Sequence, residues 1–531
     1  MNPRRFFEDL AKQKIERLAK ELQIKDPLII YKPNPKFGDL VWDTQKLKID
    51  VPQESVEKLC DENIKFQKSG KFINITFNPE KYARTVLDFI NSGDFKKNEG
   101  GLKYLIEHTS ANPTGPLHIG RARNSIIGDT MARILRRLGN EVRVEYYMND
   151  IGTQVEALLI GMEIFPDLSY TEAYRRVYEN IEQYKSKIEE YMLRAEQGDI
   201  DFLKSTRTRL EMLLEDVLRD LYSLGIRFDG IVWESDFILN GDVKGVLEKL
   251  APFLKDENGA KYIEYNDDKI YLKRSNGTSL YFTRDIAYHI YKAKNFNVPI
   301  DVLGEDHKLH FQNLTFVLKL LGIENIKVIF YSYVITKEGK MSTRRGNVIY
   351  LRDLLEESVQ LAEDEVRKRH PDLDENSIKD LATRIGHSAV RYNIIRYSPE
   401  KPITFTWEDA LNFEGESAPF IMYSYARSNS ILNKTESFHK GDNKFVEREI
   451  ELIKKMGDYM DILEEAGRTY RPDRLARYIY ELASTFNQFY RDCPVLKDPE
   501  NRDRRLEIVK AFNMVLKDAM ETLGLEITEK L

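Results

Sequence analysis

Apolar residues recur along this chain with spacings that change from segment to segment, and each spacing predicts a different element. Residues 4–22 repeat at helical intervals and predict an amphipathic helix. Its inner face is expected to carry Phe6, Leu10, Ile15, Leu18 and Leu22. The short runs 28–31 and 72–77 have the length and composition of strands, with prolines and glycines between them. Residues 1–98 are therefore predicted to form a small α+β domain.

The segment 102–138 contains a strand, a loop and a helix in succession. Its first residues, 102–106, form an apolar run of strand length, and the prolines and glycines of 113–120 can continue neither a strand nor a helix. Helical spacing then extends as far as Gly139, a favourable stop. Because 142–146 alternates like a second strand, we predict a βαβ unit. Its loop would lie at the carboxyl ends of parallel strands, where open α/β sheets bind ligands.

The rest of the chain predicts an α/β domain with a helical insertion, followed by a helical C-terminal part. Residues 155–224 are helical and heavily charged, which is typical of a solvated insertion. The runs 231–234 and 269–272 are expected to be strands that return the chain to the core. A helix at 286–294 and a strand at 300–303 predict a second βαβ half. The predicted domains are 1–98, 99–405 with an insertion at about 155–260, and an all-α bundle at 406–531.

Composition narrows the class of protein but does not identify its function. With 531 residues, 42% of them hydrophobic and 32% charged, the chain is expected to be soluble and to hold about three domains. The net charge of −6 gives no general attraction to RNA, so nucleic acid would have to bind at local basic patches. No run approaches the roughly 18 apolar residues of a membrane span, and the N-terminus has no signal-peptide core. We expect a cytoplasmic protein without membrane contact.

The cysteine content argues against a structural metal site. Cys60 and Cys493 cannot supply the four thiolates of a zinc site, and the usual partner motifs are missing. Both are expected to be buried thiols in a reducing compartment, and no metal site made only of protein groups is predicted.

The loop before the predicted helix suits a phosphate. His118-Ile-Gly120 stands where the helix begins, so free backbone N–H groups and the positive end of the helix dipole face any ligand there. The glycines at 115 and 120 have the spacing of a P-loop, but Arg121-Ala122 replaces the required Lys-Ser/Thr. We therefore reject the P-loop interpretation, and the absence of Gly-x-Gly-x-x-Gly argues against a dinucleotide site here.

Two remote motifs resemble those of class I aminoacyl-tRNA synthetases. His118-Ile-Gly-Arg121 resembles the His-x-Gly-His sequence of that class, and Lys340-Met-Ser-Thr-Arg344 resembles its Lys-Met-Ser-Lys-Ser sequence. The longer strings that begin at Ser110 and at Gly339 resemble arginyl-tRNA synthetases of the archaeal kind. The resemblance extends to both flanking domains and covers nearly the whole chain.

The resemblance implies an activity and a set of ligands. It implies ATP-dependent activation of L-arginine to arginyl-adenylate, with Mg²⁺ accompanying ATP, and transfer of arginine to tRNA. It also implies a Rossmann-like catalytic domain, an N-terminal domain that contacts the tRNA elbow and a C-terminal anticodon-binding bundle. We expect a monomer whose activation step requires bound tRNA. No enzyme nucleophile is needed, because positioning and cations near the phosphates provide the catalysis.

Residues for ATP follow from the two motifs. The catalytic residues implied are His118, Lys340 and Arg344, and the ATP-binding residues implied are His118, Gly120, Arg121, Met341 and Ser342. Arg121 replaces the second histidine of the family and Thr343 replaces its second lysine, so Lys340 or Arg344 would have to supply the transition-state cation. The alternative for His118 is that its side chain only packs against its neighbours. The alternative for Lys340 and Arg344 is that they belong to a basic run that is only exposed to solvent.

Recognition of arginine needs buried carboxylates, because a guanidinium is planar, always charged and best met by forked hydrogen bonds. The resemblance implies Glu234, Tyr281 and Asp285 for the guanidinium, and Glu107, Asn112 and His307 for the ammonium and carboxylate groups. Asp285 directly precedes the predicted helix, so its alternative role is a helix N-cap. His307 stands where other members carry glutamine. The segment 149–154 is expected to line the same cleft or to cap the next helix.

For tRNA, aromatic residues beside an arginine can stack on unpaired anticodon bases. The candidates at the start of the bundle are Tyr423, Tyr425 and Arg427, and packing in the bundle core is the alternative for each tyrosine. Rival functions are a class I synthetase for another basic amino acid such as lysine, a nucleotidylyltransferase that shares the His-x-Gly loop, and an inactive RNA-binding paralogue. The last is disfavoured by His118, Asn112 and Asp285.

Overall fold

The structure is a computed structural model that describes residues 2–28, 30–31, 37–48, 50–98, 100–112, 114–336 and 349–529. The predicted ATP-loop residues Lys340, Met341, Ser342 and Arg344 lie outside the described residues.

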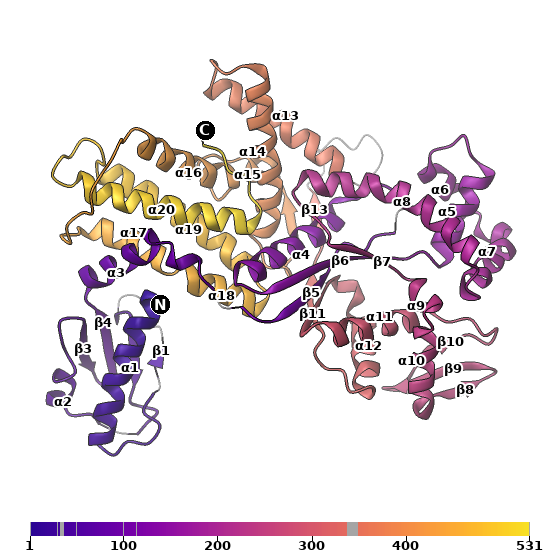
Figure 1. Cartoon of the computed structure of the whole chain (residues 1–531), viewed down its shortest axis with the longest axis horizontal. Helices are drawn as coiled ribbons and strands as arrows, with labels where there is room; N and C mark the ends of the chain where they lie inside the picture. The colour runs from indigo at the N-terminus through magenta and orange to yellow at the C-terminus, as the bar shows by residue number, and fades with distance from the viewer. Residues whose placement is uncertain are drawn as a thin grey trace.

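A five-stranded parallel sheet forms the centre of the predicted α/β domain, in the order β12-β11-β5-β6-β7 (Figure 1). Its strands are β5 (Lys103–Glu107), β6 (Glu141–Met148), β7 (Gly230–Trp233), β11 (Val298–Gly304) and β12 (Lys327–Tyr331). The first predicted βαβ unit is present, because α4 (Ile119–Arg137) joins β5 to β6. In the second half, the predicted helix 286–294 is part of α11 (Tyr281–Asn295) and leads into β11, but the parallel connection is made by α12 (Lys308–Leu320), which joins β11 to β12. The parallel α/β fold predicted from the sequence is confirmed.

Helix α4 is buried on nearly all sides. It packs against the sheet and also against α14 (Glu375–Ile395) and α20 (Arg502–Leu523) of the C-terminal helical part. This double packing explains why buried residues on α4 extend well beyond the single predicted apolar face. The helix stops where predicted, because Gly139 adopts a left-handed φ of +85°.

The insertion between β6 and the second half contains helices and a small separate sheet. The helices are α5 (Thr153–Ile164), α6 (Tyr170–Glu179), α7 (Ile181–Glu196), α8 (Ile200–Ser223), α9 (Asp236–Leu239) and α10 (Asp242–Leu250). The sheet is antiparallel and consists of β8 (Lys255–Glu257), β9 (Ala260–Tyr265) and β10 (Asp268–Lys273). The run 269–272 is a strand, as predicted, and lies in β10, which pairs with β9 and not with the central sheet. Its Ile270 and Leu272 are buried in a second hydrophobic cluster. The run 231–234 does join the central sheet, as β7.

The N-terminal residues form an α+β unit, as predicted. Helix α1 (Pro3–Glu21) accompanies an antiparallel sheet of β1 (Ile30–Tyr31), β2 (Leu40–Asp43), β4 (Phe72–Phe77) and β3 (Ile64–Ser69), and α2 (Gln53–Glu57) and α3 (Pro79–Asn91) complete the unit. The inner face of α1 carries Phe7, Ala11, Ile15 and Leu18. Phe6 and Leu22 are 46% and 38% exposed, so their predicted inward orientation is wrong.

The C-terminal part is helical apart from one strand pair. Strand β13 (Val334–Thr336) pairs in parallel with β14 (Ile403–Phe405). The helices are α13 (Leu351–Arg369), α14, α15 (Trp407–Ala410), α16 (Ala418–Asn433), α17 (Glu447–Gly457), α18 (Tyr459–Thr469), α19 (Pro472–Asp492) and α20. Cys493 is buried as expected, but Cys60 is exposed, which corrects that prediction. Within the described ranges, no helix is long and apolar enough to cross a membrane.

Candidate active site

A pocket of about 240 Å³ lies at the carboxyl edge of the central sheet, where the fold predicts a ligand site. Glu107 ends β5, Asn149 directly follows β6, Glu234 follows β7 and Gly304 ends β11. The pocket brings together all six residues predicted for arginine: Glu107, Asn112, Glu234, Tyr281, Asp285 and His307.

Asp285 is held by two histidines. Helix α11 (Tyr281–Asn295) begins four residues before Asp285 and has Leu280 as its N-cap, so the alternative role of Asp285 as an N-cap is wrong. Its Oδ1 lies 3.0 Å from His289 Nδ1, and its Oδ2 lies 2.6 Å from His310 Nε2. Burial opposes the charge, but the two histidines outweigh it and lower the pKa of Asp285. The pocket therefore contains one permanently ionised carboxylate.

Glu234 presents one unused oxygen to the pocket. Its Oε1 accepts a hydrogen bond of 2.7 Å from Nε of Arg284, which also donates to Glu196 of α7 at 2.7 Å. Its Oε2 is buried and has no hydrogen-bond partner among the described residues. Burial raises the pKa of Glu234 to about 7, against the opposing effect of Arg284. A buried acceptor without a partner is costly, so this oxygen is suited to a donor supplied by a ligand.

Two further carboxylates share one lysine behind the pocket. Glu107 and Asp301 are paired across neighbouring strands, and Lys292 Nζ lies 2.5 Å from the first and 2.7 Å from the second. Asp301 also accepts a hydrogen bond from His289 at 2.8 Å. Burial raises the pKa of Glu107, whereas Lys292 and His289 lower that of Asp301. A continuous chain of acid and base groups therefore connects Glu107 to Asp285.

Other predicted residues complete the walls of the pocket. Asn112 donates a hydrogen bond of 2.8 Å to Gln154, and Asn149 lines the pocket, so the segment 149–154 lies at the cleft. The N-cap of α5 is Gly152, which excludes the alternative that Asn149 or Asp150 caps that helix. Tyr281 is half exposed, and its hydroxyl lies 3.1 Å from His310 Nδ1.

His118 stands at the start of α4, as predicted, and serves as its N-cap residue. A Cβ atom at Gly120 would lie 3.1 Å from two atoms of the His118 ring, so the glycine allows the ring to rest on the helix end. Partial burial, and then the nearby Arg121, lower the pKa of His118. In the first turn, Ile119 N donates to Ile349 O and Arg121 N donates to His118 O. A neutral imidazole and the N–H of Gly120, which has no partner among the described residues, therefore face the same space.

That space is a second hollow of about 470 Å³, which adjoins the first. Its lining includes Gly115, His118 and Gln154, together with residues of α6. Asn112 and Arg121 line both hollows and so mark where they meet. The geometry offers an acidic pocket next to a phosphate-binding helix start.

The chain on either side of residues 337–348 lies against the His118 segment. On one side, Ile119 N donates to Ile349 O at 3.0 Å and Leu351 N donates to Leu117 O at 2.7 Å. On the other, Arg123 donates to Ser332 O at 2.7 Å and to Tyr333 O at 3.2 Å. The described residues on both sides of 337–348 therefore lie against the segment that contains His118.

Sequence reasoning missed three polar residues that line the pocket, His289, Asp301 and His310. It also missed Arg284 and Lys292, which contact the pocket carboxylates Glu234 and Glu107. A signal existed for two of them, because 285, 289 and 292 recur at helical spacing on one face of an otherwise apolar segment. His310 and Asp301 come from other elements, and only the fold brings them to Asp285.

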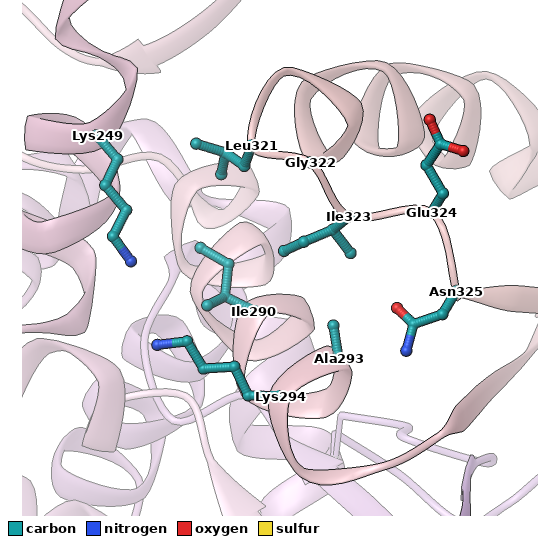
Figure 2. A pocket seen from close by; sticks show the side chains of 9 residues that line it. All are labelled: Lys249, Ile290, Ala293, Lys294, Leu321, Gly322, Ile323, Glu324 and Asn325. Carbon is teal, nitrogen blue, oxygen red and sulfur yellow. The ribbon is translucent and has the colours of Figure 1, made fainter.

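A hollow of about 640 Å³ lies elsewhere, between the last turns of α11 and α12 (Figure 2). Its walls combine aliphatic side chains such as Ile290 and Ile323 with Lys249 and Lys294. None of the predicted site residues lines it, so we do not assign the reaction to it. Among the described residues, no group of three or more histidine, cysteine or acidic side chains is arranged to hold a metal ion.

The residues predicted to bind tRNA differ in exposure. Tyr425 is only 4% exposed and packs in the bundle core, so the prediction that it stacks on a base is wrong. The guanidinium of Arg427 lies over the rings of Tyr423 and Tyr490, at 4.6 and 4.9 Å from their centroids. This stack is accessible, because Tyr490 is 41% exposed.

Comparisons with known proteins agree with this geometry. The family described as tRNA synthetases class I (R), catalytic domain, matches residues 89–407, and the DALR anticodon binding domain matches residues 421–531. The solved arginyl-tRNA synthetase of Thermus thermophilus has the same fold, with a TM-score of 0.83 at 24% identity over 98% of this chain and 99% of that one.

Curated relatives match at higher identity. Arginine–tRNA ligase of Thermoplasma acidophilum is 42% identical over 99% of this chain and 100% of its own length. The corresponding enzyme of Methanocaldococcus jannaschii is 38% identical over 96% of both chains. These matches do not favour a lysine enzyme or a nucleotidylyltransferase. The chain belongs to the arginyl-tRNA synthetase family, with a class I catalytic domain and a DALR anticodon-binding domain.

Proposed function

We propose that the two adjoining hollows hold L-arginine and ATP, and that their arrangement performs the activation step. The arginine carboxylate attacks the α-phosphorus of ATP, an acyl–phosphate bond forms, and pyrophosphate leaves with Mg²⁺. A ribose hydroxyl of tRNA then attacks the acyl carbon, and AMP leaves. The observation that carries this assignment is the acidic pocket beside the start of α4, with Glu234 Oε2 buried and unpartnered among the described residues.

In this proposal the guanidinium of arginine binds between Asp285 and Glu234. The carboxylate of Asp285 is ionised, and the free oxygen of Glu234 accepts a second hydrogen bond. Tyr281 forms the exposed wall of this end of the pocket. Glu107, Asn112 and His307 lie toward the ammonium and carboxylate groups. A compact lysine ammonium would not satisfy two separated carboxylates equally well, because it lacks the planar fork.

In this proposal ATP lies in the second hollow. His118 and the N–H of Gly120 donate to its phosphates, and the absence of a side chain at Gly120 leaves room for the His118 ring beside that N–H. Arg121 lines both hollows and offers a permanent positive charge to the phosphate that is attacked. Lys340 and Arg344, with Met341 and Ser342, are assigned to the same phosphates by sequence alone. Their part is to neutralise charge that develops as pyrophosphate leaves.

The flanking domains are assigned to tRNA. We propose that residues 1–98 contact the tRNA elbow, that 99–405 catalyse the reaction and that 406–531 bind the anticodon, with Arg427 and Tyr423 stacking on an unpaired base. The requirement for tRNA in activation, a monomeric state and a cytoplasmic location stay predictions of the sequence.

Pyrophosphate exchange tests the proposal. The purified chain is assayed with ATP, Mg²⁺ and each amino acid, with and without total tRNA. We expect exchange with arginine alone among the amino acids, and only when tRNA is present. Exchange with lysine at a comparable rate, or exchange that depends on no amino acid, would contradict the proposed substrate.

A further inference from the structure

Arg123 of α4 is a buried cation whose hydrogen bonds, among the described residues, all go to main-chain carbonyl groups. Its Nη1 donates to the carbonyl oxygens of Ser332 and Tyr333. Its Nη2 donates to those of Ser398, Pro399 and Lys401, at 3.0, 3.0 and 2.8 Å. The side chain is 0% exposed, and burial lowers the pKa of its guanidinium to about 10. At neutral pH the group is still charged.

Such a charge is costly to keep inside a protein. No carboxylate among the described residues forms an ion pair with Arg123, and its Nε has no hydrogen-bond partner there. Tyr331 and Glu305 favour the charge electrostatically, but burial outweighs them and the pKa of the guanidinium is still lowered. An aliphatic side chain of similar volume would fill the space without that cost. We therefore attribute the presence of an arginine at this position to the carbonyl groups that it binds, since the planar set of donors of a guanidinium can reach several carbonyl groups at once.

The carbonyl groups belong to two segments that start the β13–β14 pair. Ser332 and Tyr333 stand between β12 and β13, and residues 398–401 lead into β14. The two segments also bond to each other, because Ser332 N donates to Pro399 O at 2.9 Å and Ile403 N donates to Tyr333 O at 3.1 Å. Arg123 joins both segments to α4, five residues after His118.

Strand β13 runs directly toward residue 337, where the chain enters the segment that contains Lys340. The other end of that segment is attached to α4 differently. There, Ile349 and Leu351 form main-chain hydrogen bonds with Ile119 and Leu117, and no side chain takes part in those bonds. Among the hydrogen bonds of the described residues, one flank is thus joined to the His118 segment by backbone pairing and the other by the Arg123 side chain.

We propose that Arg123 is a positioning residue for the activation step: it fixes the start of β13 against α4 and thereby sets where the Lys340 segment begins relative to His118. It does not touch the substrates. This inference rests on the proposed role of Lys340 and Arg344 at the phosphates. Misplacement of a reacting group by about 1 Å can lower a rate on the order of 100-fold, so loss of this attachment should slow adenylate formation.

The test compares Arg123→Lys and Arg123→Met with Arg133→Lys. A lysine keeps the charge but has one nitrogen, which cannot reach five carbonyl groups. Arg133 lies on the same helix, bonds to Asp129 and Gly225 O, and serves as the matched control. Single-turnover adenylate formation is measured with saturating tRNA, and the dissociation constant for arginine is measured by calorimetry. We expect at least a tenfold slower adenylate step in both Arg123 variants, an arginine affinity within twofold of wild type, and a near wild-type rate for Arg133→Lys.

Hydrogen exchange distinguishes positioning from general loss of structure. In folded Arg123→Lys, faster exchange is expected at 333–336 and 403–405, with no change at 349–351. Wild-type rates in both Arg123 variants overturn the inference, as does faster exchange across the whole domain with weaker arginine binding. The variants Lys340→Ala and Arg344→Ala are assayed alongside, to distinguish a failure of the proposed role of the Lys340 segment from a failure of the role of Arg123. If both are as fast as wild type, the proposed role of the segment fails; if they are slow while the Arg123 variants are not, only the role of Arg123 fails.

Discussion

The Nε2 atom of His310 lies 2.6 Å from Oδ2 of Asp285, while His289 lies 3.0 Å from the other oxygen of the same carboxylate. Two imidazoles on different elements thus fix the plane of the acid and keep it charged. Such a carboxylate is oriented before any ligand arrives. The arrangement makes Asp285 the residue on which arginine affinity should depend most.

Replacing Asp285 by asparagine should therefore weaken arginine binding strongly. Hydrogen bonds to charged groups contribute about 1.5–3 kcal/mol each, so the Michaelis constant for arginine should rise roughly 10- to 100-fold. Asp256→Asn is the matched control, because Asp256 is 51% exposed and its ion pair with Lys261 lies in the small antiparallel sheet. Kinetics at saturating ATP and tRNA measure both variants. An unchanged Michaelis constant in Asp285→Asn would show that the pocket assignment is wrong.

Arginine binding should also depend on pH through Glu234. Burial raises the pKa of this group to about 7 in the empty pocket, so it is mostly ionised above pH 7 and increasingly protonated below it. Only the ionised form offers both oxygens as acceptors to Arg284 and the ligand. As pH falls below 7, the dissociation constant should rise, approaching tenfold per unit. Calorimetry between pH 5.5 and pH 8.5 measures this, and Glu234→Gln should bind weakly without that slope. If Glu234→Gln showed the same pH dependence of the dissociation constant, a group other than Glu234 would be responsible for it.

The sequence predicted the central strands and α4, because their apolar runs are long and their stops are clear. It failed where the outcome depends on neighbours. Phe6 and Phe7 are adjacent, and only the packing of α1 on its sheet decides which one turns inward. The helix at 286–294 has the pattern expected for the second βαβ half, yet the strand before it pairs with β9, and α12 makes the parallel connection instead.

The site shows the same division. Residues in the two recognised motifs and at strand ends could be named from the sequence, since parallel strands bring their carboxyl ends together. The groups that orient these residues and shift their pKa could not be named, because His310 contacts Asp285 from α12 and Arg284 contacts Glu196 on the insertion. Ion pairs between elements far apart in sequence leave no periodic signal. Tyr425 is the converse case, because its residue type suits stacking on a tRNA base but its side chain is buried in the core of the bundle.

A buried glutamate on α5 should make the stability of the protein depend on pH. Glu156 is 0% exposed, and one of its oxygens has no partner among the described residues. Burial raises its pKa in the folded chain from 4.5 to about 8. The folded state therefore binds an extra proton between these values, and the free energy of unfolding falls as pH rises through that range, by about 1.4 kcal/mol per unit.

Glu156→Gln removes this dependence. The variant should gain thermal stability relative to wild type at pH 8, with little difference at pH 4.5. Melting temperatures across this range provide the measurement. Glu163→Gln is the control on the same helix, since its carboxylate is partly exposed and paired with Lys187 and Arg209. A gain that is equal at all pH values would exclude Glu156 as the titrating group.

Lys340 and Arg344 should matter for the rate of activation and not for arginine affinity. A cation placed where pyrophosphate leaves stabilises the transition state, and removal of one such group typically costs about 100- to 1000-fold in rate. Single-turnover adenylate formation should therefore fall sharply in Lys340→Ala, in Arg344→Ala or in both. The arginine dissociation constant should stay near the wild-type value. If both variants form adenylate at the wild-type rate, neither residue supplies the cation.

Arg427 should contribute to tRNA binding through the stack it forms with Tyr423 and Tyr490. Its guanidinium is already oriented by a hydrogen bond of 2.6 Å to Asn487, so an unpaired base could stack beside it at little entropic cost. Arg427→Met should raise the Michaelis constant for tRNA about 5- to 100-fold, the loss expected for one stacked base, and leave those for arginine and ATP unchanged. Arg367→Met, on α13, is the control, because its ion pairs with Glu363 and Glu375 are local. Equal effects of both substitutions would indicate a general loss of positive charge instead of a specific contact.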